Sequence, residues 1–284
     1  MLKQIDQISS AGSQERPNED ISGSAGNWAW IIDGATPAFK PPVMDALSDA
    51  RWLAQTADEF FRKNAPASCN GTDLVRSFAL EAQASYLNRA PQRSGEPENW
   101  PVAALLLMLQ ENDTLHFWSL KDATAYILLQ DKSFKIINDV SAERKSEMKA
   151  AGDLMQQTCS RPNDVIKTAA FQEWISRIRE DYKDRKDYSF FGLFPESASF
   201  LHYETVRIVS DATIMLMSDG FSALCDMYQD MPPEHFVEIA VEKGLDYCLE
   251  RIRAIEREVD PEGRKFPRFK QSDDATALLL RCFL

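Results

Sequence analysis

Two apolar runs that lie far apart in the chain are each followed by an Asp-Gly pair. Residues 27–33 read NWAWIID and precede Gly34, and residues 212–218 precede Asp219 and Gly220. An apolar run of this length bounded by Asp and Gly is typical of a buried strand that stops at a turn. The sequence therefore predicts two buried strands, each with an aspartate at its end.

The other elements follow an order in which strands are interrupted by pairs of helices. The helical spacing of apolar residues predicts helices at residues 43–64, 72–89, 142–157, 164–185 and 233–259. Further strands are predicted at residues 102–110, 114–130 (broken near Lys121 and Asp122), 134–139, 206–209 and 276–283. Helix pairs between antiparallel strands predict an α+β sandwich of two packed sheets flanked by helices. A doubly wound sheet would alternate single strands with single helices, and that pattern is absent.

The chain has 284 residues, enough for one large domain or two small ones. Its turn-rich stretches are each short enough to be a loop, and no linker or repeat separates two halves. We therefore expect residues 1–284 to form a single domain.

Composition and charge exclude several classes of protein. The formal net charge of −12 argues against nucleic-acid binding, which depends on Lys and Arg to neutralise phosphates. No apolar run approaches the roughly 20 residues of a membrane-spanning helix, and the N-terminus lacks the apolar centre of a signal peptide. The five cysteines are far apart in the sequence, as expected for reduced thiols of a cytoplasmic protein.

Four short segments hold acidic residues next to strand ends: Asn18-Glu19-Asp20, Asp33-Gly34, Asp219-Gly220 and Asp273-Asp274. Hard cations such as Mg²⁺ and Mn²⁺ prefer carboxylate, carbonyl and water oxygens, and neighbouring strand ends can bring carboxylates together around them. Two such ions roughly 3.5–4 Å apart could share and activate a water molecule. Taken singly, each segment has a simpler interpretation, because Asp-Gly is common in turns and paired aspartates are common in solvated loops.

Together and in this order, short motifs along nearly the whole chain resemble those of the protein phosphatase 2C family. They are ERPNED at 15–20, WAWIIDG at 28–34, WSLKDATAYILL at 118–129, IMLMSDGF at 214–221 and SDDATALLL at 272–280.

The resemblance implies a four-layer α-β-β-α sandwich with two mainly antiparallel sheets flanked by helix pairs, forming one catalytic domain. It implies a metal-dependent phosphatase of phosphoserine and phosphothreonine with two divalent cations, Mn²⁺ or Mg²⁺, and a phosphoprotein as its partner. Bound cations would also reverse the repulsion between an acidic protein and an anionic substrate.

The family's ligand roles transfer to matching positions in this sequence. Asp33 would bridge both ions, and the carbonyl of Gly34 would bind one of them directly or through water. Asp219 and Asp273 would complete the shell of one ion. Asp33, Asp219 and Asp273 would thus act in catalysis through metal-bound water.

The second ion and the substrate would be held by the N-terminal motif. Glu19 and Asp20 would bind the second ion, partly through water, and Arg16 would contact the substrate phosphate. Asp122 stands where the family can bind a weaker third ion, or it is simply an aspartate at a strand break. Asp274 replaces an asparagine of the family, and it either supports the site or faces solvent.

Some positions depart from the family pattern. Ala35-Thr36-Pro37 replaces a His-Gly sequence, so no histidine stands there to protonate the leaving group, and Lys121 and Thr124 replace a glycine and an arginine. The basic stretch Arg264, Lys265, Arg268 and Lys270 could attract an acidic substrate, but we expect it to be a solvated loop. Two alternatives therefore remain beside a protein phosphatase: a catalytically weak binding module for phosphoproteins, and a phosphatase of small phosphorylated molecules.

Overall fold

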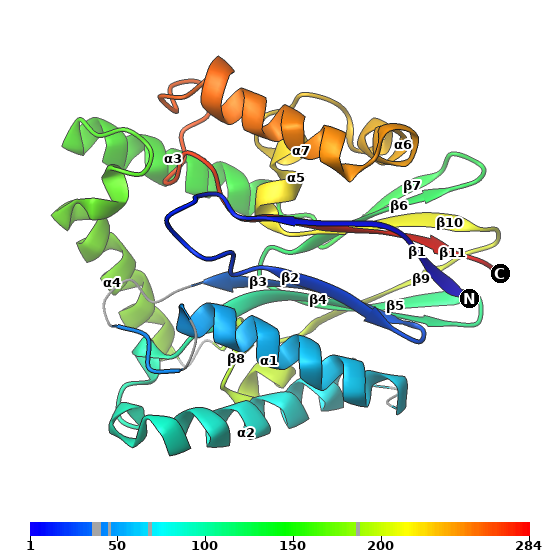
Figure 1. Cartoon of the computed structure of the whole chain (residues 1–284), viewed down its shortest axis with the longest axis horizontal. Helices are drawn as coiled ribbons and strands as arrows, with labels where there is room; N and C mark the ends of the chain where they lie inside the picture. Colours follow the sequence, from blue (N-terminus) through cyan, green and yellow to red (C-terminus); the bar gives the residue numbers. More distant parts are fainter. Residues whose placement is uncertain (36–40, 45–46, 68–69, 186–187) are drawn as a thin grey trace.

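Two antiparallel sheets pack face to face, and helices cover both outer faces (Figure 1). This arrangement is seen in a computed structural model, which describes residues 1–35, 41–44, 47–67, 70–185 and 188–284. The α+β sandwich with four α-β-β-α layers, which the sequence predicted, is confirmed.

The two sheets are built from strands that are distant in the sequence. The first sheet has the order β1 (Leu2–Ser10), β11 (Ala275–Cys282), β10 (Ala212–Met217), β6 (Thr124–Leu129) and β7 (Phe134–Ile137). The second sheet has the order β2 (Ile21–Ala25), β3 (Trp28–Ala35), β4 (Val102–Glu111), β5 (Thr114–Leu120) and β9 (His202–Arg207), with β8 (Phe191–Gly192) beside β4. The N-terminal strand and the C-terminal strand are therefore neighbours in one sheet.

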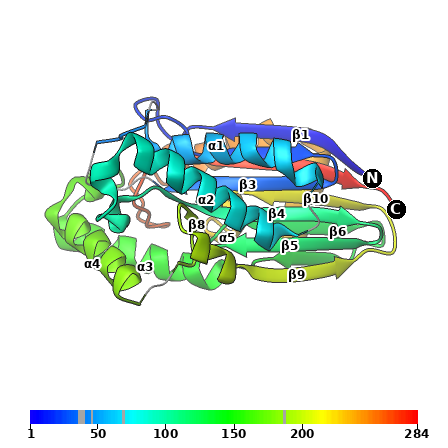
Figure 2. The ribbon, with the colours of Figure 1, turned by 90° about the horizontal axis from the view of Figure 1, so that it is seen from below.

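The helices form two outer layers and an additional layer at one end. Helices α1 (Asp49–Asn64) and α2 (Gly71–Arg89) cover the second sheet, and α5 (Asp219–Asp226), α6 (Pro233–Lys243) and α7 (Leu245–Ala254) cover the first. Helices α3 (Ser141–Thr158) and α4 (Ala169–Arg185) lie across one end of the sandwich (Figure 2). Within the described ranges, no helix is long and apolar enough to cross a membrane.

The core follows the layers, and strand β3 shows how the sequence produces it. Side chains alternate between the two faces of a strand, so Ala29 and Ile31 pack between the sheets while Trp28, Trp30 and Ile32 pack against the helices. All five are buried, because β3 is covered on both faces. This double burial explains why the run from residue 28 to residue 32 has no alternating pattern of apolar and polar residues.

Several predicted boundaries were wrong because local capping overrides apolar spacing. The helix predicted at 43–64 begins only at Asp49, because the hydroxyl of Ser48 accepts a hydrogen bond from the backbone N–H of Arg51. Residues 45–46 of that prediction lie outside the described chain. The helix predicted at 72–89 starts at Gly71, because the side chain of Asn70 is the N-cap and accepts a hydrogen bond from the backbone N–H of Thr72.

The single helix predicted at 233–259 is also wrong. Gly244, with φ of +85°, separates α6 from α7, and α7 is followed by a π-helical turn at Ile255–Val259. Strand β9 starts at His202, earlier than predicted. Strands β1 and β2 were missed, because β1 is polar on its exposed side and β2 lies within a turn-rich stretch.

Candidate metal centre

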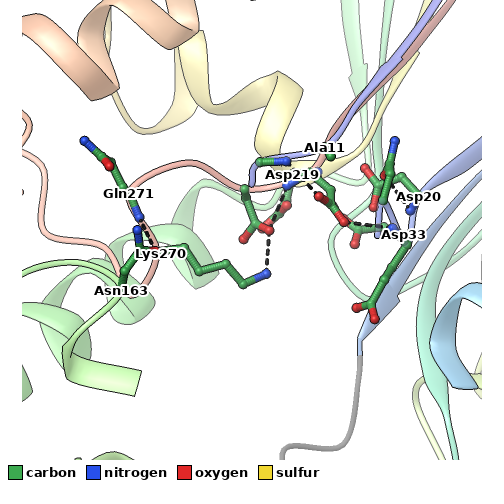
Figure 3. Close-up of polar contacts among 12 residues, drawn as sticks. Ala11, Asp20, Asp33, Asn163, Asp219, Lys270 and Gln271 are labelled. Carbon is green, nitrogen blue, oxygen red and sulfur yellow. Dashed lines mark hydrogen bonds and ion pairs between the residues drawn. The ribbon is translucent and has the colours of Figure 1, made fainter. Parts of the chain in front are cut away.

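The acidic segments meet at the end of the sandwich that α3 and α4 cover. Asp20 immediately precedes β2, Asp33 lies near the end of β3, Asp219 follows β10 and Asp273 precedes β11. Figure 3 shows Asp219 between Lys270 on one side and Asp20 and Asp33 on the other. Carboxylates from the two ends of the chain are thus brought to one place by two sheets packed together.

Strand periodicity directs Asp33 into the space between the sheets. Asp33 is two residues beyond Ile31, so it shares the face of β3 that packs against the first sheet. The backbone N–H of Asp219 donates a hydrogen bond of 3.4 Å to Oδ2 of Asp33. Burial raises the pKa of Asp33 well above its usual value, and the neighbouring charges of Asp20 and Asp219 raise it further.

Asp20 is buried with little compensation. Asp20 is only 3% exposed, and neither of its carboxylate oxygens has a hydrogen-bond partner among the described residues. Burial raises the pKa of Asp20 well above its usual value, as do the charges of Asp274, Asp219 and Asp273. The nearby hydroxyl of Ser218 favours the ionised form but does not reach hydrogen-bond geometry with either oxygen. Unpaired buried carboxylate oxygens are costly when ionised, and a cation bound beside them would offset that cost.

Two cationic side chains contact the other two carboxylates. Arg144 Nη1 donates to Oδ2 of Asp219 at 3.1 Å, and Nη2 donates to the backbone oxygen of Asp219 at 2.8 Å. Lys270 Nζ lies 2.5 Å from Oδ1 of Asp273. Burial alone would raise the pKa of Asp273, but Lys270, the backbone N–H of Asp274 and the charge of Arg144 together leave that pKa below its usual value.

Asp274 supports the site and does not simply face solvent. Its Oδ1 accepts a hydrogen bond from the backbone N–H of Gly12 at 2.9 Å, and its Oδ2 accepts one from Glu19 at 2.8 Å. The carboxylate of Asp274 therefore ties the N-terminal acidic segment to the segment before β11.

The two Asp-Gly pairs are not turns, contrary to the sequence expectation. Gly34 continues strand β3, and Gly220 is the second residue of α5. A Cβ on Gly34 would lie 2.7 Å from the backbone oxygen of Glu19, and one on Gly220 would lie 2.0 Å from that of Asp274. Glycine is required at both places because the four acidic segments pack backbone to backbone.

A cavity of about 540 Å³ opens beside these carboxylates. Arg16, Glu19, Gly34 and Asp122 line it together with Asp33, Asp219 and Asp273. Arg16 is exposed, and Asp122 lies in the turn between β5 and β6. Every residue predicted for the site except the buried Asp20 therefore lines this one cavity.

The chemistry of these residues fits a divalent cation, with one qualification that the structure itself explains. The donor set consists of hard oxygens, and Asp20 contributes two that are buried without partners. As they stand, no three acidic, His or Cys side chains in the described ranges surround a common point closely enough to hold an ion. Arg144 and Lys270 each occupy one carboxylate oxygen here, on Asp219 and on Asp273 respectively.

Sequence reasoning missed Arg144, Glu147 and the role of Lys270. Arg144 and Glu147 lie on one face of α3 and had no motif to reveal them, although a buried Arg one turn from a Glu is a usable signal. The prediction that the stretch around Lys270 is a solvated loop is wrong for two of its members. Arg268 is buried against Asp260, and Lys270 lines the cavity.

With this geometry established, comparison with solved structures identifies the class of fold. The chain has the fold of the protein phosphatase 2C-type serine/threonine phosphatases. It aligns with the catalytic domain of the serine/threonine protein phosphatase PstP in complex with two manganese ions, at a TM-score of 0.54 and 14% identity, over 98% of this chain and 97% of that chain.

Two further structures agree. The serine/threonine phosphatase PstP/Ppp of Mycobacterium tuberculosis aligns at a TM-score of 0.56 and 13% identity, over 100% of this chain and 99% of that one. The serine/threonine phosphatase Stp1 of Staphylococcus aureus aligns at 0.55 and 12% identity, over 99% and 95%. At these identities the likeness concerns the fold. No protein-family model and no curated protein matches the sequence.

Proposed function

We propose that this protein is a metal-dependent phosphatase of the protein phosphatase 2C type that hydrolyses phosphoserine or phosphothreonine in proteins. The observation that carries the proposal is the cluster of Asp20, Asp33, Asp219 and Asp273. These carboxylates come from segments more than 250 residues apart, and two oxygens of Asp20 are buried without a partner among the described residues. A set of carboxylates this short of positive charge is a suitable site for divalent cations.

The residues have separate tasks in this proposal. Asp33 and the Gly34 carbonyl, with Asp219 and Asp273, would hold one Mn²⁺ or Mg²⁺, and Asp33, Glu19 and Asp20 would hold the other. When bound, such a pair supplies an activated water and neutralises charge on the phosphoryl oxygens. The exposed guanidinium of Arg16 lines the cavity and can pair with two oxygens of a phosphate.

The charge of the cavity also favours a metal-loaded state. Eight acidic and six basic side chains line it, a net formal charge of −2. Two divalent cations would reverse this to a positive value, so an anionic phosphate ester would be attracted instead of repelled.

The far wall of the cavity favours a protein substrate over a small phosphorylated molecule. Helix α4 contributes Phe171, Trp174, Ile175 and Ile178 to this wall, and each is only partly buried. An apolar wall next to a charged centre can accept the side chains that flank a phosphorylated residue, whereas a small polar ester would not contact it. A reduced cytoplasmic setting would suit the buried thiols of Cys225, Cys248 and Cys282.

The central experiment is hydrolysis of p-nitrophenyl phosphate with and without Mn²⁺ by the wild type and by Asp33→Asn. We expect activity only with metal, and a loss of at least about two orders of magnitude in the variant, because the bridging carboxylate is weakened. Asp113→Asn, a change at an exposed carboxylate paired with Arg207, is the matched control and should keep the wild-type rate. Equal rates for wild type and Asp33→Asn would refute the mechanism.

A second measurement separates the proposed function from its alternatives. We expect a higher kcat/KM on a phosphothreonine peptide than on small phosphate esters. Tight binding of the phosphopeptide without turnover would indicate a binding module instead. A preference for a small phosphate ester would indicate a small-molecule phosphatase.

A further inference from the structure

Arg144 has a place in the centre that neither its sequence context nor the fold comparison assigns. It extends from α3, and its side chain is only 5% exposed. Besides its two bonds to Asp219, its Nη1 donates to Oε2 of Glu147 at 3.1 Å and its Nε donates to Oδ1 of Asp226 at 3.2 Å. A single guanidinium therefore joins three carboxylates that come from α3 and both ends of α5.

A fourth carboxylate also acts on Arg144. Burial raises the pKa of Asp122 to about 6, the charge of Asp219 raises it as well, and the charge of Arg144 opposes them. Burial likewise raises the pKa of Glu147 to about 7, again opposed by Arg144. Glu147, Asp219 and Asp226 thus contact one guanidinium, and Asp122 lines the same cavity as Arg144 and Asp219.

The guanidinium occupies the side of Asp219 that faces Glu147 and Asp226. It uses Oδ2 and the backbone oxygen of Asp219 and makes no bond to Oδ1. An Arg side chain stays charged at any working pH, and its fixed fork suits several oxygens at once. A divalent cation bound to Oδ2 of Asp219 would share that oxygen with a permanent cation, which is electrostatically unfavourable.

We propose that Arg144 is a built-in cation that takes the place of a third divalent ion beside Asp122 and Asp219. The protein would then need two ions, with Asp219 held in position by Arg144. The inference rests on the proposed function for the presence of the two ions, and it concerns ion number and the positioning of Asp219, so its test does not depend on catalysis.

The test is the number of Mn²⁺ ions bound, measured by equilibrium dialysis across a titration into the millimolar range. We expect two ions for the wild type and three for Arg144→Ala, because four carboxylates lose their shared positive charge. Arg144→Lys keeps the charge and should bind two. The double variant Arg144→Ala/Asp122→Asn should bind two again, because Asp122 would be a ligand of the added ion.

Each outcome decides the inference. Three ions on the wild type, or two on a folded Arg144→Ala, would overturn it. If Arg144→Ala does not fold, the number of Mn²⁺ ions bound by the single variant Asp122→Asn is measured instead. An unchanged number of two ions supports the inference, and a lost ion overturns it. A wild type that binds no Mn²⁺ would refute the proposed function itself, and one that binds two ions but hydrolyses nothing would leave the role of Arg144 standing.

Discussion

Asp20 shows how strongly a single residue can depend on what the fold places around it. It is an ordinary acidic residue in a turn-rich segment of the sequence, yet in the structure both carboxylate oxygens are buried without partners among the described residues. Its raised pKa has a direct consequence for stability. A carboxyl whose pKa is higher in the folded state stabilises the fold below its ordinary pKa, and that contribution is lost as the pH rises through the folded value.

Without metal, the melting temperature of the wild type should therefore fall as the pH rises from about 4 towards neutrality. Asp20→Asn removes one of the groups responsible and should show a shallower fall and a higher melting temperature at pH 7 in EDTA. Addition of Mn²⁺ at pH 7 should stabilise the wild type and stabilise Asp20→Asn less. Thermal melts followed by circular dichroism at several pH values test this. Parallel curves for the two proteins would contradict the burial of an ionisable Asp20.

At the scale of single elements, the turn between α6 and α7 depends on a local backbone conformation, and α4 depends on what its apolar face contacts. The break at Gly244 depends on a local φ of +85°. The presence of a glycine in a polar stretch of a predicted helix does not by itself indicate such a break. Helix α4 was predicted from its apolar face, but its partner was not. That face packs on Phe269, whose ring centre is 5.0 Å from that of Trp174, and the rest of it faces the cavity.

Replacement of Trp174 by Ala should therefore affect a peptide substrate selectively. We expect KM for a phosphothreonine peptide with apolar flanking residues to rise about five- to tenfold, since about 1–1.5 kcal/mol of apolar contact is lost. The rate on p-nitrophenyl phosphate should change less than about twofold, because that ester does not reach the α4 wall. Arg177→Ala, on the exposed face of the same helix, is the control. A parallel loss on both substrates would show that Trp174 supports the fold and not the substrate.

For the whole molecule, the core between the sheets decides whether the chain behaves as one unit. Ile31 and Leu106 from the second sheet and Leu216 and Leu278 from the first are all fully buried there. Neither sheet could bury this face alone, so we propose that residues 1–284 unfold as a single domain.

Calorimetry and tryptophan fluorescence should then report one transition at the same temperature. Ile31→Ala should lower the free energy of unfolding by about 2–5 kcal/mol, because it leaves a cavity between the sheets, without splitting the transition. Val209→Ala, at a side chain that is 75% exposed, should change stability by less than about 0.5 kcal/mol. Two separate transitions would show two domains.

The sequence alone determined the two-sheet sandwich and the identity of the acidic segments. Runs such as residues 28–32 are apolar at every position because both faces of the strand are covered, and this local property can be recognised without knowing the neighbours. The acidic segments that contain Asp33 and Asp219 could be proposed as one centre for a related reason, because neighbouring strand ends in a sandwich can bring their side chains together.

Only the tertiary structure decided which charges meet. Whether Asp20 has a partner and whether Arg144 binds Asp219 depend on segments that lie far apart in the chain, and Arg144 and Asp219 are 75 residues apart. The roles of Gly34 and Gly220 were decided in the same way, by backbone atoms that pack against them from distant segments. Apolar periodicity is a property of the residues within one element, so it can be recognised in the sequence. The free energy of a buried charge depends on its distances to groups in other elements, and only the folded chain determines those distances.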